Sequence, residues 1–569
     1  MLLSLCLAAT PSLCLAASPA LALAEQQGAV ASSQPDATAV GAAILEQGGN
    51  AIDAAIAVHF ALAVTYPYAG NLGGGGFFLV HDADGQDWFL DFRETAPAAA
   101  TPDLYLREDG SLDARSAQRG WKAAGVPGAV PGMWMAHQKW GILPWRQLVM
   151  PAYSLAKQGF RLDAHEVRRL RRVQDILAED PLASAIFLDA EGQALPIGTL
   201  LRQPQLAETL LRIANEGEAP LREGQLVEDL VAASRAGGGI LAAEDFREYQ
   251  AQLRPVMRLP WRGRTILAAS PPSSGGVFLG QALSSLQGFP LALWGWDHPR
   301  SVQVLGEATA RAFHDRNRWL GDPASMEVTV DALLDPSYLA SRRRGMSTQV
   351  YTPPSRLGVA PAPPLESAQT THFSVTDEHG AAVSCTTTLN GLFGAKVMAP
   401  GGFFLNNEMD DFAAQPGRAN QYGLVQSAAN AVIAGRRPLS SMCPVIVLDE
   451  DGQVEAVIGS PGGPTILTTV LQVLLNRFIY GMSPERAVSA PRFHRQDLPP
   501  YVQFEPNRLS SSLRSQLGQW GQPILRRDVI GDVNAIFRMR NGDMKAIADP
   551  RSHGAAVVLD RAVKEGQAD

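Results

Sequence analysis

The first apolar runs of the chain predict two helices near its start. A polar stretch at residues 31–36 ends in Asp36, whose side chain is placed to cap a helix over residues 37–47, and Gly48 with Gly49 ends that helix. The next run, residues 51–64, is almost wholly apolar. It is too short to cross a membrane, so we expect a helix buried in the core.

Shorter runs rich in β-branched and aromatic residues predict strands that come in pairs. Residues 77–81 and 88–92 follow a run of four glycines and flank a polar turn. Later in the chain, the turns between paired runs contain Asp, Asn and Gly, which are typical of hairpins. These later pairs are residues 371–376 with 382–388, 444–448 with 454–459, and 536–539 with 544–547.

Helical patterns fill most of the remaining sequence. Residues 130–250 are mostly helical in pattern, and so are residues 465–478 and 509–520. Residues 352–364 are rich in Pro and small residues, which predicts an extended, exposed segment. Hairpin strands with helices packed outside them predict an antiparallel layered α/β fold.

Composition narrows the class of protein. Of the 569 residues, 46% are hydrophobic and 18% are charged, which is ordinary for a soluble globular protein with a large core. The net charge of −8 and the lack of a long basic run argue against nucleic acid as a partner. No cysteine pair has zinc-site spacing and the ten histidines do not cluster, so we expect no metal.

The first 24 residues predict a signal peptide. Residues 2–24 carry no charge and end in Ala22-Leu23-Ala24, which fits a cleavage site. A retained membrane anchor is the alternative, but Pro11 and Pro19 would interrupt a spanning helix. No Lys or Arg lies near the start, unlike a typical signal. We therefore expect a periplasmic or secreted protein that begins at residue 25 and has no stable membrane span.

The cysteines do not form a disulfide framework. Cys6 and Cys14 would leave with the signal peptide, so Cys385 and Cys443 remain. Two cysteines in an exported chain of this size are too few to brace the fold. We expect two buried thiols, with one disulfide as the alternative.

The segment with the strongest chemical signal is Gln369-Thr-Thr-His-Phe-Ser-Val375, where the Pro-rich stretch meets a predicted strand. It resembles the self-cleavage segment of the γ-glutamyltransferase (γ-glutamyl transpeptidase) family, whose precursors cut themselves before the first Thr. The resemblance extends from about residue 30 to about residue 553. Other segments match in the family order: Asn71-Leu-Gly-Gly-Gly-Gly-Phe77, Asp91-Phe-Arg-Glu-Thr-Ala-Pro97, Thr388-Leu-Asn390, Leu405-Asn-Asn-Glu-Met-Asp-Asp-Phe412, Arg437-Pro-Leu-Ser-Ser-Met442, Gly459-Ser-Pro-Gly-Gly463 and Asp549-Pro-Arg-Ser552.

The resemblance implies an N-terminal-nucleophile fold, in which two stacked antiparallel sheets lie between helical layers (αββα). It also implies a cut between Gln369 and Thr370, which gives a large subunit of residues 25–369 and a small catalytic subunit of residues 370–569. Thr370 would then be the nucleophile, and its free α-amine, with a reference pKa of roughly 7.7–8.0, would be its base. From β-propensity alone, Thr370 would be an ordinary strand residue.

Other matched positions imply the remaining catalytic groups. Thr388 would hydrogen-bond the nucleophile and Asn390 would contact the substrate, although a strand Thr before a turn Asn is also common. Gly462 and Gly463 would offer backbone N–H groups to the oxyanion, where the alternative is a plain loop. Residues 73–76 lack the spacing of a nucleotide-binding loop, so we interpret these glycines as tight packing.

A γ-glutamyl group carries an α-carboxylate and an α-ammonium on one carbon, so its site needs both donors and acceptors. By the resemblance, Arg93 with Ser440 and Ser441 would bind the carboxylate. Glu408 and Asp411 would accept from the ammonium. The alternative for Arg93 is a surface ion pair with the neighbouring glutamate, which contributes about 0–1 kcal/mol.

The segment between Tyr422 and Ser440 resembles the lid over the substrate in bacterial members of the family, and Tyr422 matches the lid tyrosine. An ordinary surface loop is the alternative. The sequence departs from the family pattern at Cys443 and Pro464, which stand beside matched motifs. Both departures flank the expected pocket, so they bear on the specificity for the acyl group.

The resemblance implies a two-step reaction that needs no cofactor. The γ-glutamyl group of glutathione or a related compound passes to Thr370 and then to water or to an amino acid or peptide acceptor. A cephalosporin (glutaryl) acylase is an alternative, but such an enzyme has no use for Asn390, Glu408 and Asp411 as an ammonium site. A non-catalytic periplasmic binding protein is another alternative, against which the intact Thr370 argues.

Overall fold

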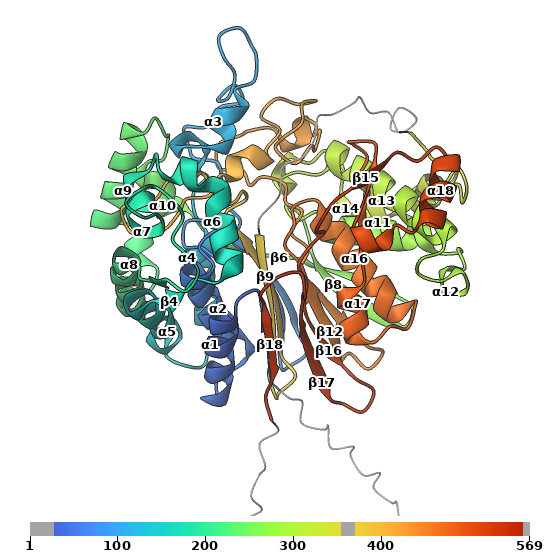
Figure 1. Cartoon of the computed structure of the whole chain (residues 1–569), viewed down its shortest axis with the longest axis horizontal. Coiled ribbons are helices and arrows are strands. Elements are labelled where there is room, and N and C mark those ends of the chain that lie inside the picture. The colour runs from blue at the N-terminus through green and yellow to red at the C-terminus, as the bar shows by residue number, and fades with distance from the viewer. Residues whose placement is uncertain (1–27, 354–369, 561–569) are drawn as a thin grey trace, which may run out of the picture.

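The computed structural model describes residues 28–353 and 370–560. The predicted signal peptide, Gln369 and most of the Pro-rich segment lie outside the described residues. Two β-sheets stand face to face in the middle of the molecule, and helices cover the outer side of each (Figure 1). This arrangement confirms the predicted αββα fold.

The first sheet has seven strands in the order β18-β1-β9-β10-β2-β3-β6, and every neighbouring pair is antiparallel. Strands from distant parts of the chain therefore lie side by side. Their bounds are β18 Ala555–Val558, β1 Ala29–Ser32, β9 Thr370–Thr376, β10 Ala382–Thr388, β2 Gly75–His81, β3 Asp87–Asp91 and β6 Gln252–Arg254.

The second sheet has six antiparallel strands in the order β17-β16-β12-β11-β8-β7. Its strands β12 and β16 pack on β9 and β10 of the first sheet. The bounds are β17 Met544–Ala548, β16 Asn534–Arg538, β12 Val454–Gly459, β11 Val445–Leu448, β8 Arg264–Ala269 and β7 Val256–Trp261. Two small sheets lie outside this core, formed by β4 Phe160–Arg161 with β5 Leu200–Leu201 and by β13 Phe493–His494, β14 Val502–Phe504 and β15 Ile524–Arg526.

Helices from the first half of the chain cover the seven-stranded sheet. Every residue of α2 is buried, and a capping box between Asn50 and Asp53 begins it, so the apolar run at residues 51–64 is a core helix as predicted. The helices of this half are α1 Pro35–Glu46, α2 Ala51–Thr65, α3 Ala114–Gln118, α4 Ala129–Trp140, α5 Trp145–Gln158, α6 Ala164–Leu177, α7 Pro181–Phe187, α8 Pro204–Glu216, α9 Gln225–Ala236 and α10 Ala243–Glu248.

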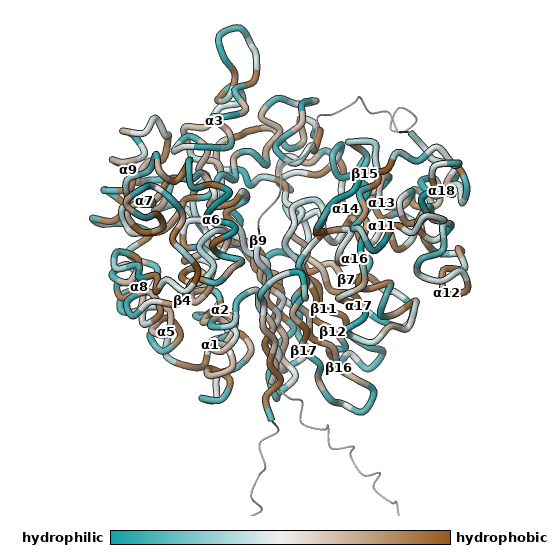
Figure 2. Tube along the Cα trace, viewed as in Figure 1, coloured by the Kyte–Doolittle hydropathy of each residue, from teal (hydrophilic) through white to brown (hydrophobic). Residues whose placement is uncertain are grey.

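A second group of helices lies on the side of the six-stranded sheet (Figure 1). The strands between the two layers are among the most hydrophobic segments in Figure 2, in keeping with a core between sheets and helices. These helices are α11 Gly275–Leu286, α12 Leu291–Trp294, α13 Pro299–Trp319, α14 Val330–Leu334, α15 Pro336–Arg343, α16 Thr465–Phe478, α17 Pro484–Ser489 and α18 Ser511–Gln519.

The predicted cap of the first helix is wrong by two residues. Pro35 occupies the first turn of α1, and Gln34 is the capping residue, with its side chain accepting a hydrogen bond from the backbone N–H of Ala37 at 3.1 Å. Asp36 lies in the first turn instead. Proline is well suited to the first helical position because it has no N–H to satisfy. Cys385 and Cys443 are buried free thiols, as predicted.

Candidate active site

Thr370 is the first residue of β9, and it stands directly opposite Thr388, the last residue of β10. The two side-chain oxygens lie 3.3 Å apart. Both residues are buried, and Thr370 keeps 5% of its surface exposed. The antiparallel register therefore places these two side chains next to each other, since residues directly opposite on neighbouring strands have adjacent Cβ atoms.

Asn390 follows Thr388 at a sharp turn. Its φ of 72° places it in the left-handed region, which Asn tolerates better than most residues. The backbone N–H of Asn390 donates to the Thr388 hydroxyl at 2.8 Å, and its side-chain amide donates to the carbonyl of Asn407 at 2.9 Å. The hydroxyl of Tyr422 lies 2.6 Å from Asn390 Oδ1. These contacts hold the Asn390 side chain in one orientation at the pocket.

Arg93 follows β3 and is fully buried, so the predicted alternative of a surface ion pair with Glu94 is wrong. Its Nη2 donates to Asp411 Oδ2 at 2.6 Å, and its Nη1 forms an ion pair with Glu408. Its Nε donates to the carbonyl of Pro438 at 3.2 Å. The predicted cation for a carboxylate and the predicted acceptors for an ammonium thus form one cluster.

Burial and mutual repulsion affect the carboxylates of this cluster. Burial raises the pKa of Glu408 well above its ordinary value, against the opposite effect of the Arg93 charge. Burial also raises the pKa of Glu94 to about 7. For Arg93, the carboxylates of Glu408, Asp411 and Glu94 outweigh burial, so its pKa is raised and it stays a cation. The cluster holds one cation among several acids, which favours a bound ammonium.

Ser440 and Ser441 lie in the loop that leads into β11. Ser441 Oγ accepts a hydrogen bond from Arg316 Nη2 at 3.0 Å, and Arg316 Nε donates to Ser274 Oγ at 3.1 Å. Ser440 Oγ accepts from the backbone N–H of Met442 at 3.1 Å. Because both serine oxygens accept from these donors, each hydroxyl proton is free to point elsewhere, including into the pocket.

Gly462 and Gly463 occupy the loop between β12 and α16. Their φ angles are 136° and 56°, which favour glycine at both positions. The Thr465 hydroxyl donates to the carbonyl of Gly462 at 2.8 Å. Within the part of the chain that the structure describes, the backbone N–H groups of the two glycines have no hydrogen-bond acceptor. Two such groups side by side are suited to bind an oxyanion.

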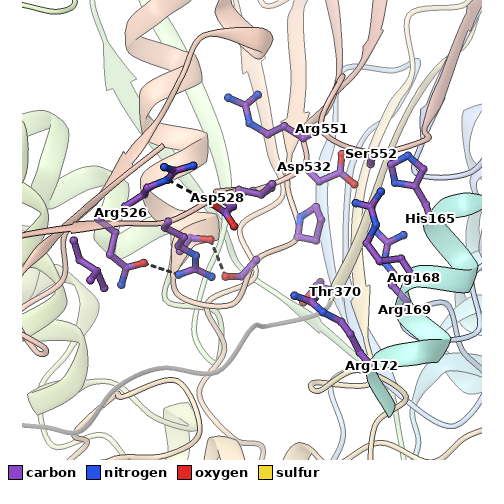
Figure 3. A pocket seen from close by; sticks show the side chains of 18 of the residues that line it. His165, Arg168, Arg169, Arg172, Thr370, Arg526, Asp528, Asp532, Arg551 and Ser552 are labelled. Atoms are coloured by element: carbon purple, nitrogen blue, oxygen red, sulfur yellow. Dashed lines mark hydrogen bonds and ion pairs between the residues drawn. The ribbon is translucent and has the colours of Figure 1, made fainter. Parts of the chain in front are cut away.

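The predicted site residues that the structure describes come from widely separated segments, and all of them except Gly462 line one small pocket. Thr370 lines this pocket and also a cleft of about 600 Å³ on its other side, which Gly462 lines as well (Figure 3). The threonine therefore lies between two spaces. The small pocket is lined by Arg93, Thr370, Thr388, Asn390, Glu408, Asp411, Tyr422, Ser440, Ser441 and Gly463, together with Leu424, Met442, Pro464 and Ile466.

Comparison with known proteins decides the family. The profile described as gamma-glutamyltranspeptidase matches residues 37–559. The chain belongs to the gamma-glutamyltranspeptidase family. It is 43% identical to the glutathione hydrolase proenzyme of Pseudomonas sp. (strain A14) over 502 residues, which cover 87% of this chain and 86% of that protein. It is 40% identical to the glutathione hydrolase proenzyme of Escherichia coli (strain K12), with 92% and 90% covered.

A solved structure agrees with the fold of this gamma-glutamyltranspeptidase family member. The crystal structure of cephalosporin acylase from Bacillus halodurans matches with a TM-score of 0.82 and 26% sequence identity, and the match covers 94% of this chain and 96% of that one. The family resemblance and the enzyme class predicted from the sequence, γ-glutamyltransferase or glutathione hydrolase, are confirmed.

The described residues contain neither a metal site nor a membrane-spanning helix. Across residues 28–353 and 370–560, no group of three or more His, Cys, Asp or Glu side chains is arranged to hold a metal ion. In the same residues, none of the helices has the length and apolar character that a membrane crossing requires.

Sequence reasoning missed Arg316. This arginine is fully buried in α13, and burial lowers its pKa to about 10. Its Nη2 donates to the Ser441 hydroxyl oxygen, and its Nη1 donates to Asn317 Oδ1 at 2.9 Å. The sequence held no signal for it, because every residue of α13 from Ser301 to Asn317 is buried, charged ones included, and no apolar face separates Arg316 from its neighbours.

Proposed function

We propose that the chain cuts itself before Thr370 and that the processed enzyme cleaves the γ-glutamyl amide of glutathione and related compounds. One observation carries the proposal. Thr370 begins a strand at the edge of a pocket that also contains Arg93 and Asp411, and its hydroxyl lies 3.3 Å from that of Thr388. A nucleophile, an ammonium acceptor and a carboxylate-binding cation thus meet in one pocket.

The first step would form an acyl-enzyme. The α-amine of the new terminus takes the proton of Thr370 Oγ1, which attacks the γ-carbonyl carbon of the substrate. The backbone N–H groups of Gly462 and Gly463 stabilise the oxyanion, and the leaving amine departs with the proton. Thr388 holds the attacking oxygen in place through the hydrogen bond between the two hydroxyls.

The second step would release the γ-glutamyl group. Water, or the amine of an amino acid or peptide acceptor, attacks the ester carbon of the acyl-enzyme and gives its proton to the α-amine of Thr370. The ester bond to Oγ1 then breaks, Oγ1 takes the proton from the α-amine, and the free threonine returns. No cofactor or metal takes part in either step, because the terminal amine, the hydroxyl and the oxyanion donors suffice.

Recognition of the γ-glutamyl group would use the buried cluster. Asp411 and Glu408 accept hydrogen bonds from the α-ammonium, and Arg93 with the hydroxyls of Ser440 and Ser441 binds the α-carboxylate. Asn390, whose side chain is hydrogen-bonded to Tyr422, lines the same pocket and faces the γ-glutamyl group. Burial strengthens each of these contacts because water competes less for the charges.

Processing would give two subunits, residues 25–369 and 370–569, that stay paired. Residues 1–24 would direct the precursor to the periplasm or the outside of the cell and then be removed. An autocatalytic cut needs a folded site, so folding of the whole precursor comes before the cut.

An acylase for glutaryl groups is the second candidate, and the similarity to the cephalosporin acylase from Bacillus halodurans favours it. A glutaryl group has no α-ammonium. If it occupied the pocket, Glu408 and Asp411 would share the guanidinium of Arg93 with no ammonium beside them, and buried carboxylates that outnumber their cation partners are costly. These two acids therefore favour a γ-glutamyl substrate.

The test begins with the mass of the purified protein. Two fragments, the smaller beginning at Thr370, support the proposal, whereas a chain that stays uncut for days at neutral pH contradicts it and favours a non-catalytic binding protein. The processed enzyme is then given γ-glutamyl-p-nitroanilide and glutaryl-p-nitroanilide. Faster release of nitroaniline from the γ-glutamyl compound supports the proposal, and the reverse order supports the acylase.

A further inference from the structure

The cleft on the far side of Thr370 is more basic than the chain as a whole. Six arginines and two aspartates are among its lining residues, although the whole chain has a net charge of −8. The helix α6 faces the cleft with His165, Arg168, Arg169 and Arg172, and Thr370 lies between this helix and the segment around Arg526 (Figure 3). The other lining cations are Arg527 and Arg551.

Four of the six arginines already have partners. Arg551 forms ion pairs with Glu505 and Asp549, and Arg526 lies 3.6 Å from Asp528. The two remaining partnered arginines are Arg527, which donates to Gln503 Oε1, and Arg169, whose guanidinium packs over the ring of Tyr68. These contacts fix part of the cleft wall, and the acidic partners of Arg551 and Arg526 offset the charges of these two arginines.

Arg168 and Arg172 differ from these four. Both are exposed, and neither forms an ion pair with any other residue in the ranges the structure describes. They are one turn apart on α6, which separates their backbones by about 6 Å along the helix axis. The lining acid Asp532 is buried and accepts from the Ser552 hydroxyl at 2.7 Å, and the arginine charges that act on it most are those of Arg169 and Arg492 rather than of Arg168 or Arg172. Two free cations thus face the space next to the nucleophile.

The position of this cleft indicates what it binds. If the γ-glutamyl group fills the small pocket, the γ-amide carbonyl stands at Thr370, and the part of the substrate beyond the amide must enter the other space that Thr370 lines. That part leaves as an amine in the first step. Guanidinium groups bind carboxylates through paired N–H donors, so an acidic leaving portion suits this cleft.

We propose that the Arg168–Arg172 cleft binds the leaving portion of the substrate and selects γ-glutamyl compounds whose leaving portion carries two or more carboxylates. The inference rests on the proposed function. For a chain of γ-linked glutamates, the first γ-amide bond breaks, the γ-carbonyl carbon bonds to Thr370 Oγ1, and the acidic peptide departs as an amine with the proton that the α-amine of Thr370 took from Oγ1. Water then completes the hydrolysis.

The experiment compares two tripeptides on the processed enzyme. One is a tripeptide of γ-linked glutamates, and the other is the same tripeptide with the α-carboxylates of its second and third residues converted to carboxamides. We expect the acidic tripeptide to have a kcat/KM about ten-fold higher. The readout is the ratio of the two kcat/KM values, so a general loss of activity in a variant cancels.

Variants locate the source of the preference. The double substitution Arg168→Gln with Arg172→Gln should lower the ratio to about two or less, and raising NaCl from about 50 mM to about 500 mM should lower it in the unmodified enzyme. Arg171→Gln is the matched control, because Arg171 is exposed on the same helix but does not line the cleft. This control should keep the full ratio.

Each remaining outcome overturns the inference. Equal kcat/KM for the two tripeptides in the unmodified enzyme would refute it, and so would a preference that survives the double substitution. If γ-glutamyl-p-nitroanilide is hydrolysed in those cases, the proposed function stands and only the role of the cleft fails. If neither the anilide nor the tripeptides are hydrolysed, the proposed function fails and this inference fails with it.

Discussion

Thr370 Oγ1 lies 3.3 Å from Thr388 Oγ1, across the first paired position of β9 and β10. The same Thr388 oxygen accepts from the backbone N–H of Asn390 at 2.8 Å. The Thr388 hydroxyl therefore connects the candidate nucleophile to Asn390, which lines the small pocket. Strand pairing places the two side chains opposite each other.

Replacing the nucleophile should stop both the cut and the turnover. We expect Thr370→Ala to give an uncut chain and to lower kcat by more than about 10⁴-fold, because no other group in the pocket supplies an attacking oxygen with its own base. Intact-mass analysis and the γ-glutamyl-p-nitroanilide assay measure the two effects. Thr370→Ser is the control and should still be cut; a fully cut Thr370→Ala protein would contradict the assignment.

Removing the Thr388 hydroxyl should slow the reaction without changing the shape of the site. Thr388→Val keeps the shape of the side chain but leaves the Asn390 N–H and the Thr370 hydroxyl without this partner. We expect kcat to fall by about 10- to 100-fold and the free energy of unfolding to fall by about 1–3 kcal/mol. Thr388→Ser keeps an oxygen, so its kcat should stay within about 10-fold of that of the unmodified enzyme. Identical kinetics for Thr388→Val and Thr388→Ser would argue against a role for the hydroxyl.

Arg316 should act on the substrate through Ser441. The substitution Arg316→Lys loses the donors that reach both Ser441 and Ser274, so we expect KM for γ-glutamyl-p-nitroanilide to rise about 10-fold with a smaller change in kcat. The second measurement is a double-mutant cycle with Ser441→Ala. If Arg316 positions Ser441, the two effects are less than additive; full additivity would show that it acts elsewhere.

Asp410 should make the protein less stable as the pH rises. Burial raises its pKa from 3.8 to about 7, so the folded protein binds this proton more tightly than the unfolded chain does. Folding stability is then greatest below pH 3.8 for this group and is lost between pH 3.8 and about 7, by on the order of a few kcal/mol.

The measurement is the melting temperature at a series of pH values. Asp410→Asn cannot ionise, so its Tm should fall less between about pH 5 and about pH 8 than that of the unmodified protein. Asp84→Asn, an exposed position in the turn after β2, is the control and should keep the original pH dependence. Parallel Tm curves for the Asp410 variant and the unmodified protein would contradict the prediction.

Much of the fold follows from hydrophobic patterning alone. The predicted bounds of β10, β12 and α16 agree with the structure, because alternating or helical apolar positions sit between clear turn residues. The first cap was misplaced, since both Gln34 and Asp36 are polar and only the position of Pro35 separates them. The order of strands in the sheets could not come from such patterns, because it depends on pairing between segments hundreds of residues apart.

Only part of the candidate site could be predicted from the sequence. Thr370, Arg93 and Gly463 are predicted from their motifs, and the structure brings them to one pocket, whereas Gly462 lines the neighbouring cleft. Arg316 belongs to no matched motif, and its contact with Ser441 joins positions 125 residues apart. Burial also could not be inferred for Arg93, because an Arg-Glu pair in sequence is most often on the surface.

The strand order has a consequence for the finished enzyme. In the seven-stranded sheet, β18, β9 and β10 come from the chain that begins at Thr370, whereas β1, β2, β3 and β6 come from the chain before it, and β1 lies between β18 and β9. A cut before Thr370 would therefore free a terminus but not a subunit. The two products would be joined by shared hydrogen-bonded ladders. The protein would therefore fold as a single chain, act as a complex of two subunits, and separate only by unfolding.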